Sequence, residues 1–320
     1  MKKTFELRQE RNFGAKISGA FEFIKQNFKG LAKPILYVAV PAALLAGYFL
    51  SEYFLFAFST IQNPNIFDDG EFSISGMVLN YSGMLLTIML GSLLVVCVIF
   101  SYFALYDEDK DRDISYSLVF AKLRKRFWRF LGYNIVYILM FSVIFAVVTV
   151  ICIIFPVFVI SQSPGIGMLL FFLLLSVFIL FIMFFISFAH ILQNTVFFEN
   201  LSIGKTLSRT IALMKGHWWE TLGLMLVISL ITSILGYIFI IPLYVIMFLN
   251  IAEVDLKEAG KILTIAVSML SMFGSFLTTL LMQIPMTIQY FNLVERKDGT
   301  GLVGQIEKIG QASIDRDEDE

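Results

Sequence analysis

The stretch 165–190, GIGMLLFFLLLSVFILFIMFFISFAH, runs for 26 residues without a charged side chain. About 20 apolar residues in a helix cross the hydrocarbon core of a bilayer, so this stretch predicts a transmembrane helix. The whole chain has a matching composition, with 58% hydrophobic and 15% charged residues. In soluble domains about 45–50% of the residues are apolar and about 25% are charged. The sequence therefore predicts an integral membrane protein.

Five further apolar runs are long enough to cross a bilayer, namely 34–58, 76–106, 129–160, 219–249 and 262–293. Backbone polar groups in lipid must be satisfied within the segment, which favours helices. We therefore predict an all-α, polytopic membrane protein with six transmembrane helices in a single domain over residues 1–310. The last ten residues, 311–320, are predicted to form a disordered acidic tail.

The cations are distributed unevenly among the segments that connect the predicted spans. Of 24 Lys and Arg, eight precede the first span, seven lie within 107–129, three within 199–217 and four after residue 294. The 59–75 and 161–164 segments have none, and Lys257 and Lys261 lie by the loop between the fifth and sixth spans. Cytoplasmic loops accumulate Lys and Arg, so both termini are predicted to be cytoplasmic.

A motif recurs just before three of the predicted spans. AKLRKRFWRFLG at 121–132 and ALMKGHWWETLG at 212–223 share Ala-x-[Leu/Met]-[Arg/Lys]-x-x-[Phe/Trp]-Trp-x-x-Leu-Gly, and FEFIKQNFKGLA at 21–32 is a looser copy. Apolar residues in these segments follow helical spacing, which predicts amphipathic helices at the membrane interface. We expect three repeats of an interface helix followed by a transmembrane hairpin. Their approximate ranges are 13–108, 114–199 and 202–295.

The segments LSRTIALMKGHWWETLG and QYFNLVERKDGTGL, before the fifth span and after the sixth, carry a resemblance to a known family. They resemble the membrane domain attached to some glycerophosphoryl diester phosphodiesterases, and similar bacterial multi-helix membrane proteins. No loop here is long enough to hold the phosphodiesterase domain, so no catalytic residue is carried over. The resemblance implies a multi-pass fold in the bacterial cytoplasmic (inner) membrane. It does not imply any particular activity.

The segment 122–132, KLRKRFWRFLG, has two interpretations. Its cations and tryptophan can fix topology and join the aromatic belt of the interface. Alternatively, it can recognise anionic lipid, because each cation near an anionic leaflet contributes about 1 kcal/mol before screening. Nucleic-acid binding is not expected, since the membrane requires the same residues. The candidate headgroup contacts are Lys122, Arg124, Lys125, Arg126, Trp128, Arg129, Trp218 and Trp219.

The cores of the predicted spans contain no Asp, Glu, Lys or Arg, which argues against proton-coupled transport. His190, Gln193 and Asn194 share a helix face and could form a polar cluster with Gln283. The alternative is ordinary hydrogen bonding between helices. The two histidines and two cysteines lack metal-site spacing, and no nucleophile or phosphate-binding motif occurs. We predict no catalytic residue, cofactor or metal.

Two functional hypotheses follow from these patterns. The first is a non-enzymatic membrane protein that organises lipid or a protein partner at the cytoplasmic leaflet through its interface helices. The second is a facilitative transporter or channel for an uncharged solute, with the polar cluster along its pathway.

Overall fold

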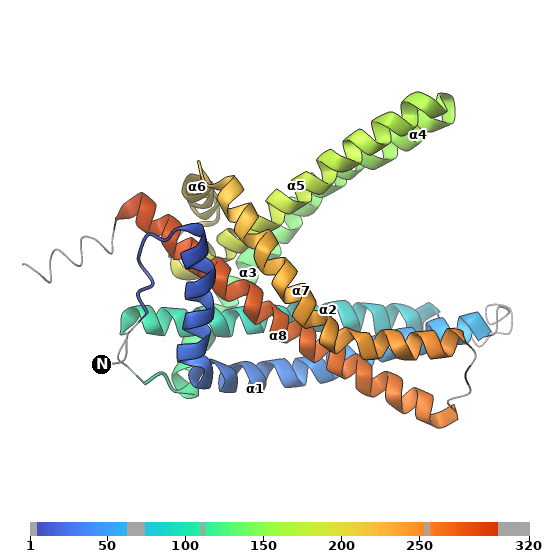
Figure 1. Cartoon of the computed structure of the whole chain (residues 1–320), viewed down its shortest axis with the longest axis horizontal. Coiled ribbons are helices and arrows are strands. Elements are labelled where there is room, and N and C mark those ends of the chain that lie inside the picture. The colour runs from blue at the N-terminus through green and yellow to red at the C-terminus, as the bar shows by residue number, and fades with distance from the viewer. Residues whose placement is uncertain (1–4, 63–73, 110–112, 253, 255–256, 300–320) are drawn as a thin grey trace, which may run out of the picture. The chain divides into compact units, whose positions relative to one another are not determined.

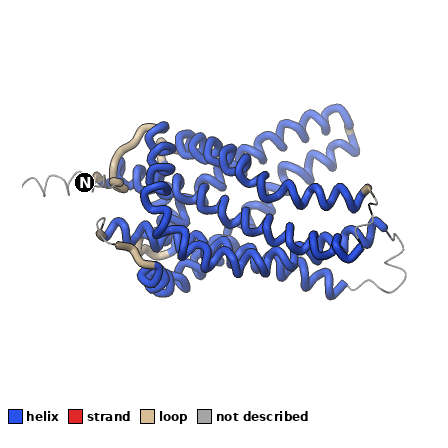
Figure 2. Tube along the Cα trace, turned by 60° about the horizontal axis from the view of Figure 1, so that its bottom comes forward, coloured by secondary structure: helices blue, strands red, loops and turns tan. Residues whose placement is uncertain are grey.

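The computed structural model describes residues 5–62, 74–109, 113–252, 254 and 257–299. Every element of this part of the chain is a helix (Figures 1 and 2). The predicted acidic tail, 311–320, lies outside the described residues. The helices are α1 (Phe13–Gln62), α2 (Ile74–Glu108), α3 (Tyr116–Thr149), the π-helix η1 (Val150–Ile154), α4 (Phe155–Gln162), α5 (Pro164–Phe198), α6 (Ile203–Met214), α7 (Trp218–Ile251) and α8 (Lys257–Asp298).

Six of the helical segments are long and apolar enough to cross a membrane, which confirms the prediction of a multi-pass helical membrane protein. They contain between 33 and 47 residues. At 1.5 Å per residue these lengths correspond to about 50–70 Å, more than the hydrocarbon thickness of about 30 Å. The segments are Phe13–Ser59, Ser75–Glu108, Tyr116–Gln162, Pro164–Phe198, Trp218–Asn250 and Ala259–Asp298.

The chain forms two compact units that interleave in sequence. Unit 1 comprises residues 1–20, 124–226 and 285–320, and unit 2 comprises residues 21–123 and 227–284. The boundaries fall inside α1, α3, α7 and α8 and do not follow the predicted repeats. The three-repeat organisation and the single domain over 1–310 therefore remain predictions from the sequence.

In unit 2, aromatic stacking and small residues hold the helices together. The Phe23 ring on α1 stacks on Phe103 of α2 at 4.4 Å, and the Tyr102 hydroxyl donates to Asn27 Oδ1 at 2.9 Å. Gly91 of α2 lies against Phe276, so a side chain there would overlap the ring. Small residues allow close helix packing in membranes, where no hydrophobic force draws helices together.

In unit 1, α5 runs back beside α4 and the end of α3 as a long apolar hairpin (Figure 1). The π-helix η1 ends at Ile154, two residues before Pro156. Proline has no N–H to donate to the preceding turn, and such a gap is accommodated by a local change in helical hydrogen bonding. The most apolar window of α5 has no buried residue. Lipid is the natural environment for so exposed an apolar hairpin.

The third copy of the sequence motif differs from the other two in its helix geometry. Here a turn at 215–217 separates α6 from α7, and Gly216 has φ +85°. The equivalent positions, Lys25 and Lys125, lie within the continuous helices α1 and α3. Among residues of all types, glycine adopts this left-handed conformation most readily. The helix therefore breaks in the one copy of the motif that has glycine, and not lysine, at this position. The expected separate pre-span helix thus occurs only in the third copy.

Candidate functional site

The five cations of the segment 122–129 have different surroundings. Lys122 forms an ion pair with Glu108. Arg126 and Arg129 are half-buried and hydrogen-bonded to other parts of unit 1. In contrast, Arg124 and Lys125 are exposed. No ion pair or hydrogen bond joins these two side chains to the described part of the chain. Only two of the five predicted headgroup cations are therefore available to a ligand.

Arg126 and Arg129 stabilise the end of α5 and the connection that follows it. Arg126 Nη1 donates to the Phe197 carbonyl at 2.6 Å, and its guanidinium lies 5.2 Å from the centre of the Phe197 ring. Arg129 donates to the carbonyls of Glu199 and Leu201 at 3.1 and 3.0 Å, and to Asn200 Oδ1. The last carbonyls of a helix have no partner within it and carry partial negative charge. These two arginines therefore have a structural role.

A second charged cluster joins the end of α5 to α6 and α8. Arg209 Nε donates to both carboxylate oxygens of Glu199 at 3.1 and 3.0 Å, and another of its nitrogens donates to Asp298 at 3.1 Å. The hydrogen bond to Asp298 and the charge of Glu199 raise the pKa of Arg209 above its usual value, although burial opposes this. The Tyr290 hydroxyl also donates to Glu199 at 3.0 Å. Arg209 stays charged, and this cluster is committed to protein contacts.

A third cluster centres on Glu220 near the start of α7. Its carboxylate pairs with Lys16, whose side chain is fully buried, and with Arg296 at 2.9 Å. His217 Nδ1 lies 3.2 Å from the same carboxylate. Arg296 also donates to the Arg11 carbonyl at 3.3 Å. These contacts join the start of α1, the start of α7 and the end of α8.

The aromatic residue at the eighth position of each copy of the sequence motif is largely exposed. The exposed fraction is 75% for Trp128 and 70% for Trp219, and their equivalent in the first copy of the motif, Phe28, is 61% exposed. Trp218 is half-buried and stacks on Phe188 at 5.9 Å. Of the predicted tryptophan contacts, Trp128 and Trp219 are accessible and Trp218 is mainly a packing residue.

An exposed cation precedes each of the three exposed aromatic residues by three or four positions. Lys25 precedes Phe28, Lys215 precedes Trp219, and both Arg124 and Lys125 precede Trp128. Within a helix, residues at this spacing share a face, so Arg124, Lys125 and Trp128 form one exposed basic-aromatic face of α3. The sequence motif contained these residues, but it did not distinguish them from the half-buried cations beside them.

The predicted polar cluster has mixed surroundings. Asn194 is fully buried and its amide donates to the His190 carbonyl at 2.8 Å on the same helix. Gln193 instead lines a groove on the α3 side of α5. Gln283 belongs to unit 2, whereas the other three belong to unit 1. Within unit 1, the neighbours Gln193 and Asn194 thus have different environments.

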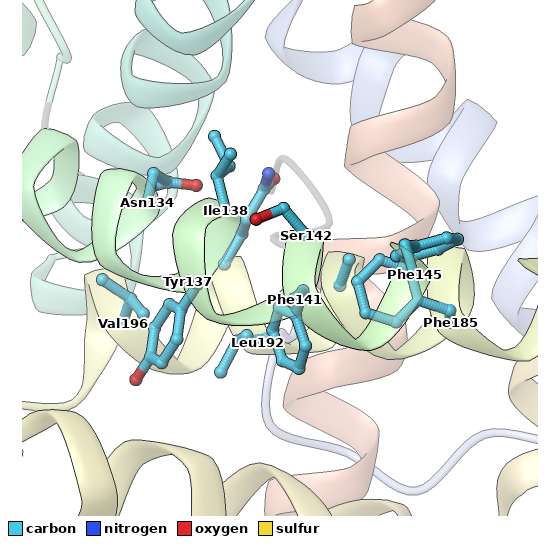
Figure 3. A pocket seen from close by; sticks show the side chains of 11 residues that line it. Asn134, Tyr137, Ile138, Phe141, Ser142, Phe145, Phe185, Leu192 and Val196 are labelled. Atoms are coloured by element: carbon cyan, nitrogen blue, oxygen red, sulfur yellow. The ribbon is translucent and has the colours of Figure 1, made fainter. Parts of the chain in front are cut away.

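The groove lies between α3 and α5 and has a volume of about 370 Å³ (Figure 3). Six residues of α3 line it at helical spacing: Asn134, Tyr137, Ile138, Phe141, Ser142 and Phe145. Five residues of α5 form the other wall: Phe185, Ala189, Leu192, Gln193 and Val196. The wall is almost entirely apolar. This site was not predicted from the sequence, where its only signal is the α3 stripe that begins at Asn134.

The groove changes character along its length. At the end nearest the charged clusters it is lined by the amides of Asn134 and Gln193. At the other end the ring of Phe185 contacts the rings of Phe141 and Phe145, with centroids 4.9 and 4.7 Å apart. The amide of Gln193 has no hydrogen-bond partner among the described residues. The site therefore combines a polar mouth with an aromatic inner end.

Comparison of the chain with family models, with curated proteins and with solved structures found no match. The resemblance to the membrane domain of glycerophosphoryl diester phosphodiesterases therefore remains a prediction.

Proposed function

We propose that this chain is a non-enzymatic, multi-pass protein of the bacterial inner membrane that binds anionic lipid at the cytoplasmic leaflet. The observation that carries the proposal is the exposed face of α3 formed by Arg124, Lys125 and Trp128. In this proposal both termini are cytoplasmic, as the distribution of cations predicts.

The recurrence of exposed aromatic residues supports the proposal. Phe28, Trp128 and Trp219 are large apolar residues with more than half of their surface exposed, and each follows an exposed cation. Aromatic side chains with a nearby cation suit the headgroup region, where one part of the surroundings is apolar and another is charged. Three such pairs would give the protein three headgroup contacts.

The expected strength of the α3 contact follows from the number of available cations. Each contributes about 1 kcal/mol near an anionic surface. Arg124 and Lys125 together thus contribute about 2 kcal/mol, which is about a 30-fold preference for anionic lipid at low ionic strength. Lys122, Arg126 and Arg129 already have partners within the protein, which argues against the larger value that five free cations would give.

Native mass spectrometry with added phosphatidylglycerol or phosphatidylcholine tests the proposal. We expect the wild-type protein to retain phosphatidylglycerol preferentially, and R124Q/K125Q to lose most of this preference. The variant K205Q/K297Q is a matched control, because it also removes two exposed cations on the predicted cytoplasmic side, neither of which stands just before an exposed aromatic residue. Equal retention of phosphatidylglycerol by the two variants would contradict the proposal.

The transporter hypothesis lacks comparable support. It requires Gln193 and Asn194 to serve one pathway, but Gln193 lines the groove while the side chain of Asn194 is fully buried.

A further inference from the structure

We infer that the α3–α5 groove is a binding site for one acyl chain of a membrane phospholipid. This inference rests on the proposed function, because it assigns a site to the tail of a lipid whose headgroup lies near the exposed face of α3. The groove has the depth, the cross-section and the polarity gradient that this ligand requires.

The depth of the groove corresponds to one leaflet. Asn134 and Phe145 are 11 positions apart on α3, or about 16 Å along the helix axis. Half of a hydrocarbon core of about 30 Å is about 15 Å. Asn134 stands five residues after Arg129, the last cation before the long apolar part of α3. The groove thus begins near headgroup level and extends towards the middle of the membrane.

The cross-section of the groove fits a hydrocarbon chain and excludes a helix. A volume of about 370 Å³ spread over about 16 Å gives a mean cross-section of about 23 Å². An extended hydrocarbon chain, whose neighbours lie about 4 Å away, needs about 15–20 Å². A helix about 10 Å across needs about 80 Å². A whole helix, from a second copy of the chain or from a partner, is therefore too wide to lie inside the groove.

The chemistry of the wall also favours a phospholipid chain. An extended peptide would bring unsatisfied backbone groups into the hydrocarbon region, at a cost of several kcal/mol for each group. An acyl chain has none. Its ester carbonyls would lie near the mouth, where the Gln193 amide can donate a hydrogen bond. Because Ile138 is 52% exposed at the edge of the groove, a chain can enter sideways from the surrounding lipid.

Photolabelling tests the site directly. The protein is reconstituted in vesicles that contain phosphatidylglycerol with a diazirine in the middle of one acyl chain, irradiated, digested and analysed by mass spectrometry. We expect labels to concentrate on 134–145 and 185–196 relative to the equally apolar segment 165–180. Labelling at equal density along the whole hairpin would overturn the inference.

Two variants test whether the groove is the reason that photolabels concentrate on 134–145 and 185–196. Ala189→Phe places a ring in the groove and should reduce labelling of 134–145 to the level of 165–180. Ser142→Phe obstructs it from the α3 wall and serves if Ala189→Phe does not fold. Leu139→Phe is the control, because Leu139 is 64% exposed and does not line the groove. Persistence of the concentrated labels in both groove variants would also overturn the inference.

The two proposals can fail independently. Concentrated groove labelling without a preference for phosphatidylglycerol over phosphatidylcholine would refute the headgroup proposal and retain the acyl-chain site. A strong phosphatidylglycerol preference with uniform labelling would retain the proposed function and refute the groove as its tail site.

Discussion

Replacement of Arg129 by glutamine tests whether the cations of the 122–129 segment have two separate roles. Arg129 donates to the carbonyls of Glu199 and Leu201 and to Asn200 Oδ1. Hydrogen bonds from a charged donor contribute about 1.5–3 kcal/mol each. Since the side chain is half-buried and glutamine retains one donor group, we expect R129Q to lower the free energy of unfolding by about 2 kcal/mol. That loss corresponds to roughly a 30-fold change in the ratio of folded to unfolded protein.

The assay is thermal unfolding of the purified protein in a mild detergent, compared with R124Q on the same helix. By the scaling of globular proteins, about 2 kcal/mol lowers the Tm of a chain of 320 residues by about 3 °C. Arg124 is exposed, so R124Q should change stability by no more than about 0.5 kcal/mol. Lipid retention should show the opposite order, with the larger loss in R124Q. Equal Tm values for the two variants would refute the division into structural and ligand-binding cations.

Two further changes test the charged cluster around Glu220 and the turn before α7. E220Q leaves the fully buried ammonium of Lys16 without its carboxylate and should lower the free energy of unfolding by about 3–5 kcal/mol. The double variant K16M/E220Q should recover part of this loss, and an absence of recovery would contradict the pairing. Gly216 has φ +85°, so G216A should cost about 1–2 kcal/mol. Gly132 lies within α3 with open space around a new Cβ, so G132A should not lower the free energy of unfolding. Equal losses of stability in G216A and G132A would contradict the backbone role assigned to Gly216.

The membrane-spanning helices could be predicted because their signal is local. An apolar run such as 165–190 exceeds the length that a helix needs to cross the hydrocarbon core, whatever the rest of the chain does. Gly83 and Gly91 of α2 stand eight positions apart, on one face of the helix, and they lie against Phe49 and Phe276, as expected of small residues where helices pack closely. Both features follow from the spacing of residue types within one helix.

The division of the basic segment could not be predicted, because it depends on distant parts of the chain. Arg126 and Arg129 bond to carbonyls that lie about 70 positions away, and backbone carbonyls have no signature in a sequence. The partner of Lys16 is 204 positions away. In the sequence alone, these cations were indistinguishable from the exposed Arg124 and Lys125.

The groove was missed for a related reason. The stripe from Asn134 to Phe145 has the same composition as a surface that faces lipid. Whether it borders a groove depends on how closely α5 packs against it, which is a property of both helices. The helix break at Gly216, by contrast, had a sequence signal in the single glycine at that motif position, and comparison with Lys25 and Lys125 would have identified it.

The most direct test of lipid binding is fluorescence quenching of Trp128 by brominated lipids. The chain has three tryptophans, so W218F/W219F leaves Trp128 as the single reporter on the exposed face of α3. At equal low mole fractions in vesicles, brominated phosphatidylglycerol should quench this fluorescence more strongly than brominated phosphatidylcholine. The difference should shrink as salt screens the cations and disappear when R124Q/K125Q is introduced. Equal quenching by the two lipids at low ionic strength would contradict the account.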